Sequence, residues 1–198
     1  MWAANHVGIA FRPVLVDFSK GSHRTPEFVS RNPNMRMPVL EDGNYVLWES
    51  NAILQYLAAQ KPEAGLLPED VKARLQIVKW QFWDSAHWDP ACAIFAFENY
   101  VKQLFQRGEP DAGEIARGGE MFTRLAPVLD GELQKHRYVA GEALTLADFS
   151  LGAMNYIAER AKFPLQTYRG IQRWAADLKS LPSWQKTATE APAILQAR

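Results

Sequence analysis

Cysteine is nearly absent from the sequence, which carries a single one, Cys92, among 198 residues. One cysteine can form no intramolecular disulfide and cannot supply a cysteine-rich metal cluster. His, Cys and carboxylate residues do not cluster elsewhere in the sequence, so we expect no metal site. This cysteine usage is typical of a reducing compartment, and we predict a cytoplasmic protein.

Net charge and long apolar runs are also missing. The 22 Lys plus Arg residues balance 22 Asp plus Glu, so no global positive field is available to hold a nucleic acid. No stretch approaches the length of a membrane span, and the N-terminus lacks the basic and apolar regions of a signal peptide. We therefore expect no nucleic-acid partner and no membrane insertion. The 47% hydrophobic fraction is ordinary for a folded globular chain.

The first sixty residues carry strand patterns as well as helix patterns. A β-branched run at 14–18 predicts a buried strand, and residues 37–40 and 44–48 predict an antiparallel hairpin across a charged, Gly-containing link. Thr25 followed by Pro26 predicts the start of a short helix. Ser50 begins a segment with an apolar stripe at helical spacing, and so predicts a second helix.

Helical patterns dominate after a segment, 61–70, in which proline and glycine recur at short intervals. We interpret 61–70 as a linker between a domain of residues 1–60 and a helical domain of residues 71–198. A long, aromatic-rich pattern runs from Val71 to Phe105, with a distortion expected near Pro90. Thr145 and Asp148 have the spacing of a capping box, which we assign to folding and not to chemistry.

Four segments make the sequence recognisable when they are taken together. They are Ser19–His23 (SKGSH), Asn32–Leu40 (NPNMRMPVL), Glu49–Leu57 (ESNAILQYL) and the pair Ala147–Asp148. In this combination the chain resembles the cytosolic glutathione transferases over roughly residues 3–190. The resemblance implies an α/β plus all-α architecture, in which a thioredoxin-like N-terminal domain holds glutathione and an all-helical C-terminal domain supplies the pocket for a small electrophile. It also implies a homodimer, to which the surplus apolar faces of the helix from Val71 would contribute.

The resemblance assigns the glutathione site residue by residue. Pro38 resembles the family's cis-proline, beside which the Met37 main chain pairs with the cysteinyl part of glutathione; the alternative is an ordinary trans proline at a strand edge. Ser50, at a helix N-terminus, suits the γ-glutamyl carboxylate. Glu49 would accept a hydrogen bond from the γ-glutamyl ammonium. The alternative is that Glu49 is an exposed acid that only stabilises the helix start.

Two cationic side chains match family positions at the glycine end of glutathione. These are His23 and Arg36, whose alternatives are a solvent-exposed loop histidine and a plain surface charge. Near the expected distortion at Pro90, His87 and Trp88 are candidates for the second-substrate pocket, although most aromatic residues of this helix should belong to the core. We interpret Cys92 as a small buried hydrophobe.

The sequence departs from the family at its N-terminus. Met1–Gly8 matches the second half of the family's first helix, so the first strand and the loop that bears the thiol-activating Ser, Tyr or Cys have no counterpart, and no catalytic residue can be assigned. Either residues precede Met1 or the chain is a truncated form, and we favour the first. The expected activity is conjugation of glutathione to apolar electrophiles. The alternatives are a non-catalytic glutathione-binding or scaffold protein, or a glutathione-dependent isomerase, dehalogenase or thiol transferase.

Overall fold

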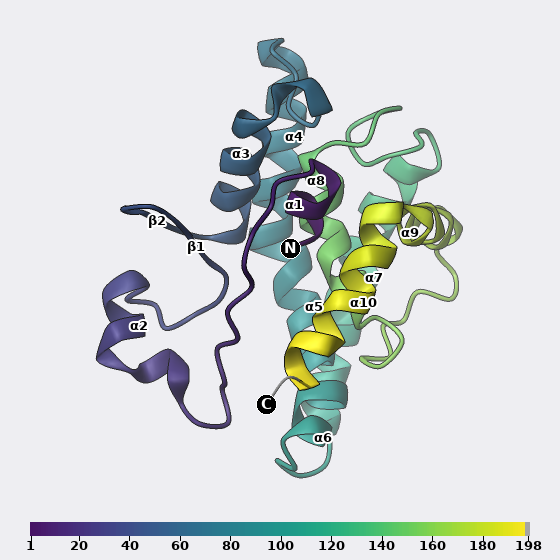
Figure 1. Ribbon diagram of the computed structural model, residues 1–198. Helices are drawn as coiled ribbons and strands as arrows, with labels where there is room; N and C mark the ends of the chain where they lie inside the picture. Colours follow the sequence, from purple (N-terminus) through teal and green to yellow (C-terminus); the bar gives the residue numbers. More distant parts are fainter. Residues whose placement is uncertain (197–198) are drawn as a thin grey trace. The chain divides into compact units, whose positions relative to one another are not determined.

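The computed structural model describes residues 1–196 of the chain, and the side chains of residues 1–190 (Figure 1). It divides into two compact units, residues 1–65 together with the C-terminal helix, and residues 66–181. The elements of the first unit are α1 (Trp2–His6), η1 (Ser22–Arg24), α2 (Pro26–Arg31), β1 (Val39–Asp42), β2 (Tyr45–Trp48), α3 (Ser50–Gln60), η2 (Pro62–Ala64) and α10 (Pro182–Gln196). Those of the second are α4 (Val71–Trp83), η3 (Asp84–Trp88), α5 (Asp89–Phe95), η4 (Ala96–Val101), α6 (Lys102–Leu104), α7 (Ala112–Leu133), α8 (Leu146–Gly152), η5 (Ala153–Tyr156) and α9 (Arg169–Ser180).

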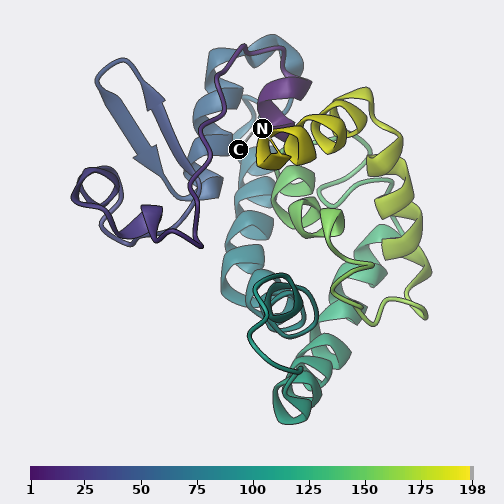
Figure 2. The same cartoon turned by 60° about the horizontal axis from the view of Figure 1, so that its bottom comes forward.

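The predicted hairpin is present in the N-terminal unit (Figure 2). β1 and β2 pair antiparallel, with Val39 opposite Trp48 and Asp42 opposite Tyr45. The two residues between the strands begin with Gly43, whose φ of 58° lies in the left-handed region that glycine adopts without a Cβ penalty. The start of α2 is also as predicted, because the Thr25 hydroxyl accepts a hydrogen bond from the main-chain N–H of Phe28.

The strand predicted at 14–18 is wrong. This segment is extended but belongs to no strand, and the sheet of the described residues has two strands only, β1 and β2. In Figure 2 it follows α1 as a long ribbon without arrow or coil. Val14 is 69% exposed rather than buried. A β-strand exists through main-chain bonds to a neighbour, and within residues 1–196 no other strand lies alongside this segment to supply them.

The C-terminal helix joins the N-terminal unit, whereas the sequence pattern placed it in a helical domain of residues 71–198. α10 packs against α1, where the indole rings of Trp2 and Trp184 meet edge to face with centroids 4.8 Å apart. The Trp2 Nε1–H donates to the Ser183 hydroxyl over 3.2 Å, and the Asn5 amide donates to the Thr187 hydroxyl over 2.9 Å. These contacts join residues more than 175 positions apart, which local periodicity does not register.

The helical unit is centred on α8, a short apolar helix whose seven residues are all buried. The capping box at its start is confirmed, since the Asp148 carboxylate accepts from the Thr145 main-chain N–H over 2.9 Å. The same carboxylate, 0% exposed, accepts from the Val139 N–H and from the Trp174 Nε1–H, each over 2.9 Å. Asp148 thereby connects α8, the loop before it and α9.

The distortion expected near Pro90 is present and begins earlier. Asp84–Trp88 forms a π-helical turn between α4 and α5, and Pro90 lies in the first turn of α5. The main chain stays helical from the turn into α5, and the Asp89 N–H donates to the Asp84 carbonyl across the π-helical turn, so the missing N–H of Pro90 falls where the regular hydrogen-bond pattern is already interrupted. Among the helices of residues 1–196, none combines the length and the apolar character needed to cross a bilayer.

Candidate functional site

The N-terminus of α3 presents two exposed polar side chains, Glu49 and Ser50. Ser50 is the first helical residue, and the Glu49 main-chain oxygen accepts the first helical bond, from Ile53 N–H at 3.0 Å. Glu49 has a φ of 72°, a left-handed conformation that costs free energy for a residue with a Cβ and often marks a functional position. The helix start combines first-turn N–H groups that have no carbonyl partner within the helix, a positive dipole end and the Ser50 hydroxyl, and is suited to bind a carboxylate.

The loop before β1 contains the second part of the site. The Met37–Pro38 peptide bond is cis, as predicted. Asn32, 2% exposed, holds this loop, because its amide Nδ2–H donates to the Arg36 carbonyl over 2.7 Å and its Oδ1 accepts from Asn34 N–H over 3.0 Å. Arg36, Met37 and Pro38 are all exposed. The structural role of Asn32 was missed from the sequence, in which Asn32–Pro33 is visible only as a helix stop.

His23 lies in η1, with its ring against the ring of Phe18 at a centroid distance of 4.7 Å. The Arg24 Nε–H donates to His23 Nε2 over 3.2 Å. The other ring nitrogen, Nδ1, is buried and has no hydrogen-bond partner in the described structure. The pairing of His23 with Arg24 could not be predicted from the sequence, since adjacent residues point in many relative directions outside regular elements.

The two residues proposed for the second-substrate pocket differ in environment. The Trp88 side chain is 3% exposed and packs against Phe122, with ring centroids 4.9 Å apart, so it belongs to the core of the helical unit. His87 is exposed on the same π-helical turn. Of the pair, only His87 therefore has its side chain at the surface.

A buried acid at the same turn was missed from the sequence. Asp84 is 8% exposed and accepts a hydrogen bond from the Ser150 hydroxyl over 2.6 Å. The pKa of Asp84 is raised to about 6, chiefly by burial, which the Ser150 hydrogen bond opposes and the nearby Asp89 carboxylate reinforces. The sequence feature that could have indicated this buried acid is the position of Asp84 within the apolar helical pattern from Val71 to Phe105.

The lone thiol lies in the core of the helical unit. Cys92 is 0% exposed, as predicted, and burial raises its thiol pKa well above the ordinary value, so the nucleophilic thiolate is disfavoured. The described residues include no group of three or more His, Cys, Asp or Glu side chains placed to bind a metal ion.

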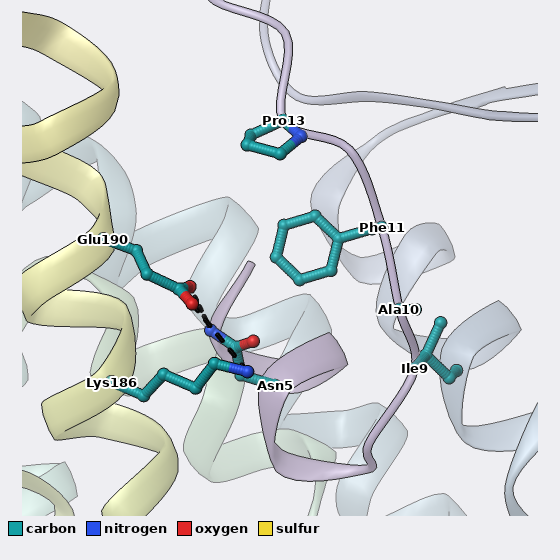
Figure 3. Close-up of a pocket in the computed structure, with 7 residues that line it drawn as sticks. All are labelled: Asn5, Ile9, Ala10, Phe11, Pro13, Lys186 and Glu190. Atoms are coloured by element: carbon teal, nitrogen blue, oxygen red, sulfur yellow. Dashed lines mark hydrogen bonds and ion pairs between the residues drawn. The ribbon is translucent and has the colours of Figure 1, made fainter. Parts of the chain in front are cut away.

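A groove of about 470 Å³ lies between α10 and the extended segment that follows α1 (Figure 3). Its lining consists of Asn5, Ile9, Ala10, Phe11, Pro13, Lys186 and Glu190. One end is polar, where the Asn5 amide donates to Glu190 Oε2 over 2.9 Å, and the Phe11 ring faces the other end. None of the residues predicted for glutathione or its partner substrate lines this groove.

The class defined by these features is a thioredoxin-like domain, here with a short two-stranded sheet, followed by an all-helical domain. The model of the glutathione S-transferase N-terminal domain matches residues 1–59, and that of the C-terminal domain matches residues 87–182. The chain belongs to the glutathione S-transferase family.

Individual relatives agree with this assignment. Glutathione S-transferase 3 of Zea mays is 30% identical over 194 residues, which cover 95% of this chain and 86% of the relative. The crystal structure of the theta class glutathione S-transferase from Xanthomonas axonopodis pv. citri, with glutathione bound, superposes with a TM-score of 0.80 at 30% identity, covering 93% of this chain and 87% of that one. The crystal structure of glutathione transferase F7 from Populus trichocarpa superposes with a TM-score of 0.87 at 26% identity. The match covers 95% of this chain and 90% of that one.

Proposed function

We propose that this chain binds glutathione at the exposed face formed by the start of α3 and the loop before β1. The observation that carries the proposal is the Glu49–Ser50 pair, which combines a left-handed φ at Glu49 with an exposed helix start that has no side-chain cap at Glu49. The γ-glutamyl carboxylate would bind at Ser50, its ammonium at Glu49, and the cysteinyl part at the Met37 main chain beside Pro38. The glycine end would meet the basic side chains His23 and Arg36.

The proposed reaction is conjugation, in which the glutathione sulfur forms a bond to an electrophilic carbon and the leaving group departs with the bonding electrons. The sulfur must be a thiolate, and lowering its pKa by two units requires about 2.7 kcal/mol of preferential stabilisation of the thiolate. Small apolar electrophiles are the proposed second substrates, with His87 beside them in the helical unit. The proposed compartment is the cytoplasm, where glutathione is kept reduced.

A homodimer is the proposed assembly. Within α4, Val71, Leu75 and Phe82 are spaced four and seven residues apart and are 66%, 56% and 72% exposed. These positions share one helical face, because residues separated by four or seven positions lie above one another on a helix. Such an apolar face is typical of a surface that a second copy covers.

The binding proposal is tested by calorimetry with glutathione on the parent chain and on Ser50→Ala. Loss of a hydroxyl that bonds a carboxylate should weaken binding about tenfold. Ser30→Ala is the matched control, since Ser30 is an exposed helical serine whose hydroxyl donates to the Glu27 carbonyl over 2.8 Å, away from the proposed ligand. Equal affinity of the parent and Ser50→Ala would contradict the assignment of the γ-glutamyl carboxylate.

The conjugation proposal has a separate test. The parent chain is assayed for thiol addition to a chlorinated nitroaromatic compound, with the uncatalysed rate subtracted. Turnover above that rate supports the transferase. Binding of glutathione without turnover of this or other electrophiles would favour the alternative of a non-catalytic glutathione-binding protein.

A further inference from the structure

The groove between α10 and the extended segment after α1 is separate from the proposed glutathione site. Its volume of about 470 Å³ lies in the range of small-molecule sites in proteins. All of its lining residues belong to the N-terminal unit, in which the ring contact between Trp2 and Trp184 joins α1 to α10. The groove is therefore a cavity built within one unit, and its lining indicates which ligand it suits.

The polar end of the groove contains an amide whose orientation is determined by its neighbours. Asn5 Nδ2 is 2.9 Å from both the Thr187 hydroxyl and Glu190 Oε2. The Thr187 O–H donates to the Ser183 carbonyl over 2.8 Å, so its oxygen accepts from Asn5, as a carboxylate oxygen must. Both amide hydrogens are thus used, and Asn5 Oδ1 accepts no hydrogen bond from the described residues. In Figure 3 this oxygen lies on the side of the amide that faces away from Glu190.

Glu190 Oε1 is a second acceptor at the same end. Lys186 Nζ is 3.8 Å from it, too far for a hydrogen bond, and the two side chains are 59% and 38% exposed. An exposed pair of this kind contributes little free energy and separates readily. The Met1 amino group is another cation on which Glu190 acts, but burial lowers its pKa and favours its neutral form, an effect that the carboxylate only partly opposes. A ligand cation can therefore compete for Oε1.

The remaining lining is apolar and includes Ile9, Phe11 and Pro13. The Phe11 ring faces the groove and is 38% exposed, although it is a large apolar side chain. A flat ring bound against Phe11 and Pro13 would remove apolar surface from water, and aromatic pairs gain further from their ring geometry. The groove thus combines an end rich in acceptors with an end suited to a ring.

We propose that this groove binds a primary amine that carries an aromatic ring, with the ammonium at Asn5 Oδ1 and Glu190 Oε1 and the ring against Phe11. An ammonium group offers several N–H donors and a positive charge in one compact group, and has no acceptor of its own. A hydroxyl has a single donor, so it can satisfy one of the two acceptors. A carboxylate would gain Lys186 but would lie beside the Glu190 carboxylate, which repels it. The proposal does not depend on glutathione binding.

The test uses three probes that share a phenyl ring and a two-carbon link and differ in the end group. They are 2-phenylethylamine, 2-phenylethanol and 3-phenylpropanoate, titrated into the parent protein at about pH 7 and followed by NMR. The amine should bind about tenfold or more tightly than the alcohol, the range of a hydrogen bond to a charged group, and the carboxylate should bind most weakly. Equal affinities, tightest binding of the carboxylate, or no binding of the amine at millimolar concentration would each overturn the proposal.

Two acid-to-amide variants locate the ammonium. Glu190→Gln keeps an oxygen that accepts from the Asn5 amide but removes the charge, so the ratio of amine to alcohol affinity should fall to near one. Glu120→Gln is the matched control, since Glu120 is an exposed acid of α7 that does not line the groove, and it should leave the ratio unchanged. The ratio within one variant is insensitive to a general loss of folded protein, because both ligands lose equally. An amine preference that survives in Glu190→Gln, or that disappears in Glu120→Gln, would refute the assignment.

Two further variants separate the ring from the charge. Phe11→Ala should weaken the amine and the alcohol by the same factor, because both lose the same ring contact. Lys186→Gln removes a cation that competes for Glu190, so it should not lower the amine affinity. Unchanged affinities in Phe11→Ala would show that the ring binds elsewhere, and loss of amine binding in Lys186→Gln would contradict the role of Glu190; either result overturns the proposal.

Discussion

Replacing Asp84 by asparagine should stabilise this protein at neutral pH, although it removes an acid that makes a good hydrogen bond. The carboxylate is 8% exposed, between the π-helical turn and α8, and the Ser150 hydroxyl donates to it over 2.6 Å. The charged group that acts on its pKa is the Asp89 carboxylate, which is itself acidic and so supplies no counter-charge. Asparagine keeps the shape and an oxygen that accepts from Ser150, but carries no charge.

The magnitude follows from the pKa of Asp84, which is raised from 3.8 to about 6. A difference of 2.2 units at 1.36 kcal/mol per unit corresponds to about 3 kcal/mol. The folded state holds its proton more tightly than the unfolded state, so the free energy of unfolding rises as the pH falls from about 6 towards 3.8. Above pH 6 the full cost of the buried charge is present, and below 3.8 it is absent.

The assay is urea unfolding of the parent and Asp84→Asn at a fixed protein concentration, over a pH series from about 4 to 8. Near pH 8 the variant should exceed the parent by up to ~3 kcal/mol, and the gain should shrink as the pH falls through 6. Ser150→Ala, which removes the hydroxyl that donates to this carboxylate, should destabilise the protein most at high pH. A difference between Asp84→Asn and the parent that is the same at every pH would refute the reasoning, because it would show that Asp84 is not a buried titrating charge.

Two further predictions concern the core and the assembly. Asp148→Ala should lower the free energy of unfolding by about 3–5 kcal/mol in urea titrations, because the N–H groups of Val139, Thr145 and Trp174 lose a common buried acceptor. A loss below ~1 kcal/mol would mean that water replaces the carboxylate. Light scattering at micromolar concentration should give twice the mass of one chain, and Phe82→Asp should reduce it to that of a monomer; a monomeric parent would contradict the dimer.

The features predicted correctly from the sequence are those determined by residues close together in the chain. The Thr25 cap of α2 depends on an N–H three residues later, and the Thr145–Asp148 box on the same spacing. The hairpin depends on a two-residue turn that contains Gly43. A helix cap or a tight turn needs only residues within one element, so contacts with the rest of the protein rarely change it.

The buried face of α4 could not be predicted, because that helix is apolar on more than one side. Leu75 and Phe82 are part of its regular apolar repeat, yet they are exposed, while Ile77 and Trp80 are 1% and 5% exposed in the core. Periodicity shows that a helix has an apolar face, but it cannot choose between two such faces when each has another element or another molecule to meet.

In the candidate site too, the features set by local sequence were predicted and those set by tertiary contacts were not. The main-chain features at Pro38 and Ser50 follow from residue type and local spacing, and the structure has the cis bond and the helix start where the sequence placed them. The state of the His23 ring depends instead on Phe18, on Arg24 and on what covers Nδ1, none of which has a sequence pattern. A histidine is a donor or an acceptor only with respect to its neighbours. Its residue type alone therefore suggested a carboxylate ligand, whereas the structure shows its Nε2 accepting from the adjacent Arg24.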